Sequence, residues 1–128
     1  MKTRRLILIS SSIELATGLA LFAAPNLVAN LLLGSGLAPS GEAVARVGGL
    51  GLFSLALACW PKGEADHQHA IRALFLYNLT AAVYLGYLRI GGQFAGFLLL
   101  PACVLHALLA FLFARPAYRS FKDENPVT

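Results

Sequence analysis

Long apolar runs separated by short polar connections dominate the chain. The runs lie at 6–33, with a break near Pro25, and at 42–60, 70–89 and 93–115. Each is about as long as the roughly 20 residues that a helix needs to cross a bilayer. The pattern therefore predicts four membrane-spanning helices in a single membrane domain, residues 1–128. Residues 116–128 are polar without apolar periodicity and are expected to form a flexible tail.

The composition supports the same class of protein. Hydrophobic residues make up 58% and charged residues 12% of the 128 residues, and the mean hydropathy is +0.70. Soluble domains average about 45–50% apolar and about 25% charged residues, so this chain has too much apolar surface for a water-soluble core. We expect an all-α fold, an integral membrane antiparallel four-helix bundle. No soluble catalytic domain, cofactor or metal is expected.

Lysine and arginine lie mainly at the ends of the apolar runs, where they orient membrane proteins. With both termini in the cytoplasm, only Arg46 and Arg89 of the ten basic residues would lie on the outer side. The other eight are Lys2, Arg4, Arg5, Lys62, Arg72, Arg115, Arg119 and Lys122. This bias predicts a multi-pass protein of the bacterial inner membrane whose partner is lipid, not nucleic acid. A homo-oligomer or a membrane partner protein stays open as well.

Small residues and one proline mark expected features of packing. Helices in lipid associate through close contacts between small residues, and the cluster Gly48-Gly49-Leu50-Gly51 is expected to be such a close-approach surface. Pro101 lies inside the fourth run and would leave the carbonyl of Phe97 without its helical donor. A kink is therefore expected at Pro101.

Four polar residues fall inside the expected spans, namely Glu14, Arg46, Asn78 and His106. Counted at 1.5 Å per residue, Glu14, Asn78 and His106 all lie roughly 12–14 Å from the cytoplasmic boundary. Arg46 lies nearer the outer boundary, roughly 10 Å above Glu14, and its long side chain could reach the carboxylate or extend outward. We expect a shared polar layer, and the ionisation of Glu14 and its pairing with Arg46 stay open.

This layer has two interpretations. In one it is a hydrogen-bonded clasp that holds the helices in register. In the other, Glu14 binds a proton or cation with His106 as relay partner, because ionisable groups inside a membrane are often functional. His67 and His69, with Asp66, are candidate metal ligands at the inner loop. Two histidines at i, i+2 without further ligands are a weak signal, however, and a solvated loop is favoured. Because Glu14 also interrupts the first apolar run, the sequence favours a retained anchor over a cleaved signal peptide.

Several segments resemble a family of small bacterial four-transmembrane-helix inner-membrane proteins that has no assigned activity. They are Glu14-Leu15-Ala16-Thr17-Gly18, Val44-Ala45-Arg46-Val47-Gly48-Gly49, Cys59-Trp60, Leu76-Tyr77-Asn78, Pro101 and His106-Ala107. The chain is similar to DoxX-like proteins in size and architecture only. It shares a membrane glutamate in the first span with small multidrug resistance transporters, but lacks their aromatic and proline motifs. The resemblance implies a four-helix inner-membrane protein.

The sequence therefore favours a non-enzymatic integral membrane protein with a structural or accessory role. The alternative is a small proton-coupled transporter that uses Glu14. An enzyme is the least favoured class, since no nucleophile–base pair is visible in the sequence.

Overall fold

The computed structural model describes residues 3–61 and 67–124, and in these ranges it contains five α-helices and no strand. The helices are α1 (Thr3–Ala23), α2 (Pro25–Leu33), α3 (Pro39–Ala58), α4 (His67–Ile90) and α5 (Leu99–Glu124). All but the short α2 are long and apolar enough to cross a membrane. The prediction of an all-helical chain with four candidate spans is therefore confirmed for the described residues.

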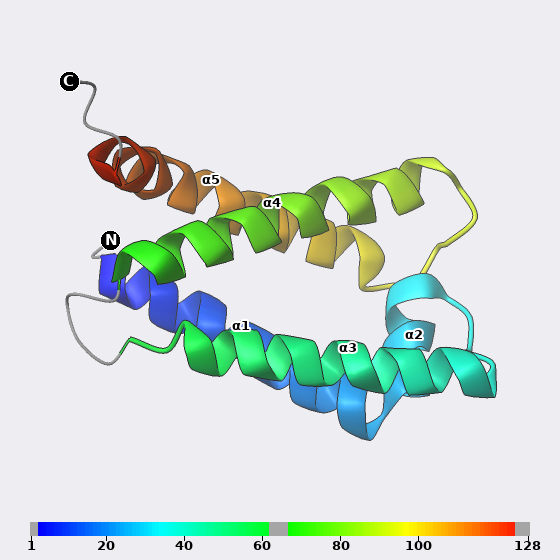
Figure 1. Ribbon diagram of the computed structural model, residues 1–128. Helices are drawn as coiled ribbons and strands as arrows, with labels where there is room; N and C mark the ends of the chain where they lie inside the picture. The colour runs from blue at the N-terminus through cyan, green and yellow to red at the C-terminus, as the bar shows by residue number, and fades with distance from the viewer. Residues whose placement is uncertain (1–2, 62–66, 125–128) are drawn as a thin grey trace.

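The long helices form two layers of two (Figure 1). One layer consists of α1 packed along α3, the other of α4 packed along α5, and the two layers share fewer contacts. The start of α1, the start of α4 and the end of α5 lie at one end of the molecule, which we call the terminal end. The short α2 and the α4–α5 connection lie at the opposite end, the α2 end.

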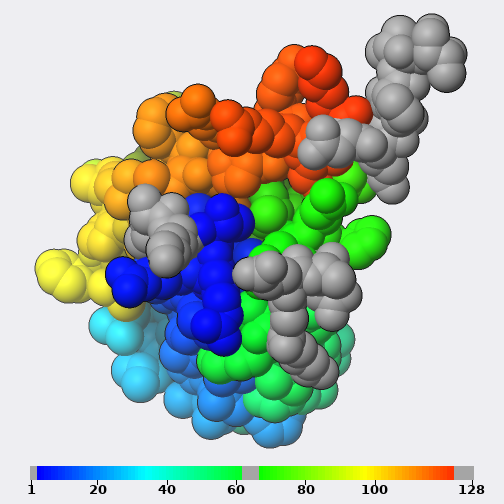
Figure 2. All heavy atoms as spheres, turned by 90° about the vertical axis from the view of Figure 1, so that its left-hand side faces the viewer, coloured from blue at the N-terminus to red at the C-terminus, as the bar shows by residue number. Residues whose placement is uncertain are grey.

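The buried core joins the two layers near the terminal end. Its members come from the first turns of α1 and α4, the residue that follows α3, and the middle of α5: Leu6, Ile7, Cys59, Ala70, Ile71, Leu74, Leu109, Phe113 and Ala117. Figure 2 looks onto this end and shows the start of α1, in blue, beside the last turns of α5, in orange and red. The layers are thus packed tightly at the terminal end.

Large apolar side chains cover the outside of the helices. Val44 on α3 is 72% exposed and Phe111 on α5 is 76% exposed, and many leucine, valine and aromatic side chains share this exposure. A water-soluble monomer rarely leaves contiguous apolar patches of this extent open. The outer surface is instead suited to contact with lipid tails.

The break near Pro25 separates two helices. Residues 6–33 were expected to form one kinked span, but α1 ends at Ala23 and α2 begins at Pro25. Proline fits the first position of a helix because its missing N–H is not needed there. Gly34 ends α2 with φ 78° and donates its N–H to the carbonyl of Asn30 at 3.0 Å. Only glycine adopts this left-handed conformation readily.

The expected start of the fourth span at residue 93 and the kink at Pro101 are both wrong. Helix α5 begins only at Leu99, because the preceding amides bond elsewhere: Ala95 N donates to Leu33 O at 3.3 Å and Leu98 N donates to Leu31 O at 2.8 Å. Pro101 consequently lies in the first turn of α5, where its missing N–H breaks no helical hydrogen bond.

The expected flexible tail at residues 116–128 is wrong as far as Glu124, where α5 ends. Pro116 lies inside the helix, but two buried residues beyond it, Ala117 and Ser120, face the protein. The Arg72 guanidinium on α4 donates to the Ser120 hydroxyl at 2.8 Å and lies 5.0 Å from the centre of the Phe121 ring. These contacts outweigh the single hydrogen bond that proline removes from the helix.

Candidate functional site

Asn78 is the centre of a hydrogen-bonded cluster that joins three helices. Its side chain is fully buried on α4. The amide Nδ2 donates to Ser10 Oγ on α1 at 3.2 Å and to the carbonyl of Leu74 at 2.8 Å. On the other side, Asn78 Oδ1 lies 2.8 Å from His106 Nδ1 on α5. We call Ser10, Asn78 and His106 the clasp.

The partners of Asn78 fix the direction of each hydrogen bond in the clasp. The Leu74 carbonyl can only accept, so the amide nitrogen of Asn78 faces it, and Oδ1 faces His106 as an acceptor. His106 Nδ1 must therefore carry the proton and donate. In a neutral imidazole the other nitrogen, Nε2, is then left as an acceptor.

Glu14 lies one turn after Ser10 on α1 and is fully buried. Among the described residues, neither carboxyl oxygen has a partner at hydrogen-bond geometry, and the same holds for Ser11 Oγ one turn earlier. The Tyr77 phenol on α4 is close enough to the carboxyl for an electrostatic interaction. The Tyr77 ring also meets the His106 ring edge to face, with centroids 5.6 Å apart. Glu14 thus adjoins the clasp without being bonded into it.

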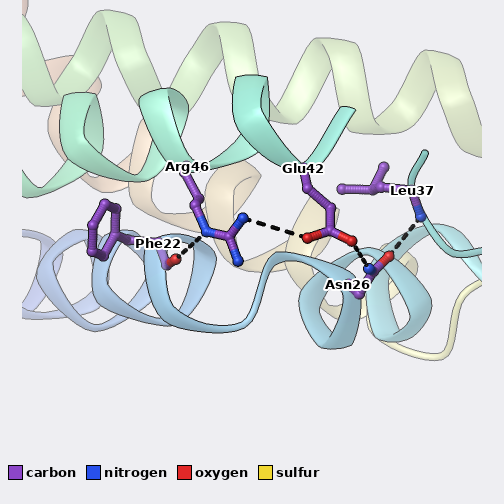
Figure 3. Close-up of polar contacts among 5 residues, drawn as sticks. All are labelled: Phe22, Asn26, Leu37, Glu42 and Arg46. Carbon is purple, nitrogen blue, oxygen red and sulfur yellow. Dashed lines mark hydrogen bonds and ion pairs between the residues drawn. The ribbon is translucent and has the colours of Figure 1, made fainter. Parts of the chain in front are cut away.

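Arg46 belongs to a second cluster, near the α2 end (Figure 3). Its Nε donates to the carbonyl of Phe22 at 3.2 Å, and its Nη1 lies 3.4 Å from Glu42 Oε2 on the same helix. The other oxygen of Glu42 accepts from the amide of Asn26 on α2. Asn26 Oδ1 in turn accepts from the backbone N–H of Leu37 at 2.7 Å. This cluster ties α1, α2 and the α2–α3 connection to α3.

The structure thus unites only part of the expected polar layer. Asn78 and His106 are in direct contact and Glu14 lies beside them, but Arg46 pairs with Glu42 and not with Glu14. Neither Glu42 nor Asn26 was expected from the sequence as a partner in this cluster. A signal for Glu42 was present, since an acid and a base four residues apart face each other on a helix. Asn26 gave no local signal, because its contact spans 16 positions.

A cavity of about 480 Å³ lies between the two layers and is lined by residues from all five helices. Most of its lining is aliphatic; the polar lining residues are Thr17, Tyr77, Tyr84 and His106. A wider hollow of about 690 Å³ lies at the terminal end beside Arg115 and Arg119, away from the clasp. Of these two spaces, only the inter-layer cavity is lined by a residue of the clasp, His106.

No group of three or more potential metal ligands occurs in the part of the chain that the structure describes. His67 begins α4 and His69 follows on its first turn. Asp66, which accompanies them in the sequence, lies outside the described residues.

Comparison with known proteins adds no relative: no protein-family model, curated protein or solved structure matches the chain.

Proposed function

We propose that the four long helices cross the bacterial inner membrane as an antiparallel bundle with both termini in the cytoplasm. Two observations support this: the apolar outer surface, and the basic residues Arg4, Arg5, Arg72, Arg115 and Arg119 of helix segments at the terminal end. Basic residues accumulate on the cytoplasmic side of membrane proteins. A fluorescent protein fused to the C-terminus should fold and fluoresce in the cytoplasm. A periplasmic phosphatase fused there should be inactive, and an active phosphatase would contradict this orientation.

Within this arrangement we propose a non-enzymatic, structural or accessory role. The observation that carries the proposal is the clasp, since one asparagine bonds to α1 and to α5 and so connects both layers. Hydrogen bonds between helices in lipid contribute about 0.6 kcal/mol on average and up to about 1.7 kcal/mol. A protein that must hold its helices in one register, for example to present a fixed surface to a membrane partner or a second copy, needs this kind of contact.

A double-mutant cycle on Asn78→Ala and His106→Ala tests the clasp. We expect a coupling free energy of about 0.6–1.7 kcal/mol in thermal unfolding of the detergent-solubilised protein. The control cycle pairs Thr80→Val with His106→Ala. Thr80 is on the same helix, but its exposed hydroxyl bonds only to the carbonyls of Leu76 and Tyr77, so this cycle should be additive. Additivity in both cycles would remove the support for the clasp.

The burial of Glu14 favours a second candidate function, that of a small proton-coupled transporter. The clasp explains the presence of Ser10, Asn78 and His106. The buried Glu14 carboxyl, in contrast, has no hydrogen-bond partner among the described residues and therefore does not stabilise the fold. A charge at the bilayer centre costs at least about 2.5–3.5 kcal/mol. A carboxyl is therefore expected there only if the protein binds and releases its proton during function, or if the carboxyl stays protonated and neutral. This second role rests on Glu14 alone.

Proteoliposomes that enclose a pH-sensitive dye distinguish the two roles. Under a gradient of a lipophilic cation such as tetraphenylphosphonium, a transporter would move protons in the opposite direction. Glu14→Gln should abolish this movement, whereas Ser11→Ala, one turn away on the same helix, should preserve it. If the native protein moves no protons, the transporter candidate is wrong and the accessory role remains.

A further inference from the structure

The inter-layer cavity has the size and lining of a binding site for a small lipophilic molecule. Its volume of about 480 Å³ falls within the range of about 300–1,000 Å³ that is usual for small-molecule pockets. Its walls are mainly leucine, alanine and aromatic side chains from both layers. None of the buried residues of the core near the terminal end lines it. The layers therefore leave this space between them in the membrane-spanning part.

One hydrogen-bonding atom gives this cavity a preference for ligands that donate a hydrogen bond. His106 is part of the lining, and its Nδ1 is bonded to Asn78. Its Nε2 has no hydrogen bond to any described residue. An imidazolium against this apolar lining would be a poorly solvated charge, so the neutral ring is the relevant form. Since Nδ1 carries the proton, Nε2 is an acceptor that can receive a hydrogen bond from a bound molecule.

Tyr77 also lines the cavity, and its phenol can both donate and accept a hydrogen bond. It is therefore compatible with a ligand that carries a hydroxyl group. The preference for a donor comes from His106 Nε2 alone.

We propose that the cavity between the helical layers binds a lipophilic molecule that carries a hydroxyl group, with the hydroxyl donating to His106 Nε2 and the apolar body lying among the aliphatic side chains. The class includes membrane-soluble phenols and alcohols. The proposal adds a ligand to the accessory role. It depends on the orientation of Asn78 and His106, not on the free energy that their contact contributes to folding, so the ligand and the clasp can fail separately.

Two probes of nearly equal size test the donor requirement, 4-hexylphenol and 4-hexylanisole. Both have the same apolar body, but the anisole has no hydroxyl proton. The full-length protein in lipid nanodiscs would be labelled with ¹⁵N-histidine, so that His67 and His69 serve as internal references for His106. We expect 4-hexylphenol to shift the His106 Nε2 resonance and to bind about tenfold more tightly than 4-hexylanisole, which corresponds to one hydrogen bond.

Two variants on α4 test the location without altering His106. Ala81→Phe fills the cavity, since Ala81 is part of its lining. Val83→Phe adds the same side chain at a position that is 66% exposed on the outer surface and absent from the lining. We expect Ala81→Phe to abolish 4-hexylphenol binding and Val83→Phe to leave it unchanged. Circular dichroism and gel filtration of both variants check that the fold is intact.

Several results would overturn the proposal. Equal binding of the phenol and the anisole would indicate partition into an apolar space that lipid fills equally well. Undiminished binding in a folded Ala81→Phe variant would place the molecule elsewhere. No binding of 4-hexylphenol, or no change at the His106 Nε2 resonance, would remove the site.

Discussion

Gly18 on α1 and Gly49 on α3 face each other so closely that a Cβ atom on either residue would lie 2.7 Å from the carbonyl oxygen of the other. Backbone nitrogens complete the contact: the added Cβ would lie 2.7 Å from Phe53 N at Gly18 and 2.8 Å from Phe22 N at Gly49. Because all these atoms belong to the main chain, no side-chain rotation can make room. The packing of α1 on α3 therefore depends on two glycines.

We predict that Gly18→Ala and Gly49→Ala each destabilise the protein by about 1–3 kcal/mol, the usual effect of forcing extra atoms into a packed contact. The double variant should be less destabilised than the sum, because the first substitution already separates the helices. Thermal unfolding in detergent measures this. Gly51→Ala is the matched control, since an added Cβ there meets no atom within 4 Å, and it should be neutral or slightly stabilising.

This contact was only half predictable from the sequence. The cluster of glycines at residues 48–51 indicated a close-approach surface. Gly49 is part of one, whereas a Cβ atom added at Gly51 would meet no atom within 4 Å. Gly18 is a single glycine in the first span and gave no comparable signal. Which glycine is used depends on the rotation of each helix about its axis, and that rotation is set by the whole interface and not by local sequence.

Glu14 and Arg46 provide the second prediction. The structure keeps them in different clusters, so the effects of Glu14→Gln and Arg46→Gln on the free energy of unfolding should add within about 0.5 kcal/mol. Glu14→Gln alone should be neutral or stabilising, because it replaces a carboxyl without hydrogen-bond partners by a neutral group of the same shape. The same thermal unfolding assay measures this, and the double-mutant cycle on Asn78 and His106 shows the size of coupling expected for two residues in contact. Strong coupling between Glu14 and Arg46 would mean that they form a pair, contrary to the structure.

The reason that the sequence left the partner of Arg46 open is physical. Glu42 is one turn away on the same helix, and such a pair forms wherever the helix forms. Contact with Glu14 would have required a reach of roughly 10 Å between two helices of unknown relative rotation. Asn78 and His106 were easier to associate, since two polar side chains at the same depth in lipid gain most by bonding to each other.

Asn26 supplies the third prediction, because its amide accepts from Leu37 N and donates to Glu42. Asn26→Asp keeps the acceptor but places a second carboxylate against Glu42. We expect a loss of about 1–3 kcal/mol in thermal unfolding. Adding Glu42→Gln should restore most of it, since the exchanged pair again joins one amide to one carboxylate. Equal stability of Asn26→Asp and the native protein would show that the contact does not form.

Gly96 in the α4–α5 connection yields the last prediction. A Cβ atom there would collide with the backbone of Leu32 and lie 2.6 Å from Leu31 O. Gly96→Ala must therefore move the connection away from α2 and lengthen the hydrogen bonds from Ala95 N to Leu33 O and from Leu98 N to Leu31 O. We expect a loss of about 1–3 kcal/mol, together with faster hydrogen exchange at the amides of Ala95 and Leu98. Gly91→Ala, whose Cβ would meet nothing closer than 3.4 Å, should change neither quantity. If exchange at these two amides stays slow in Gly96→Ala, the α4–α5 connection does not pack against α2 as described. The position of α2 beside the inter-layer cavity would then have to be stabilised by other contacts.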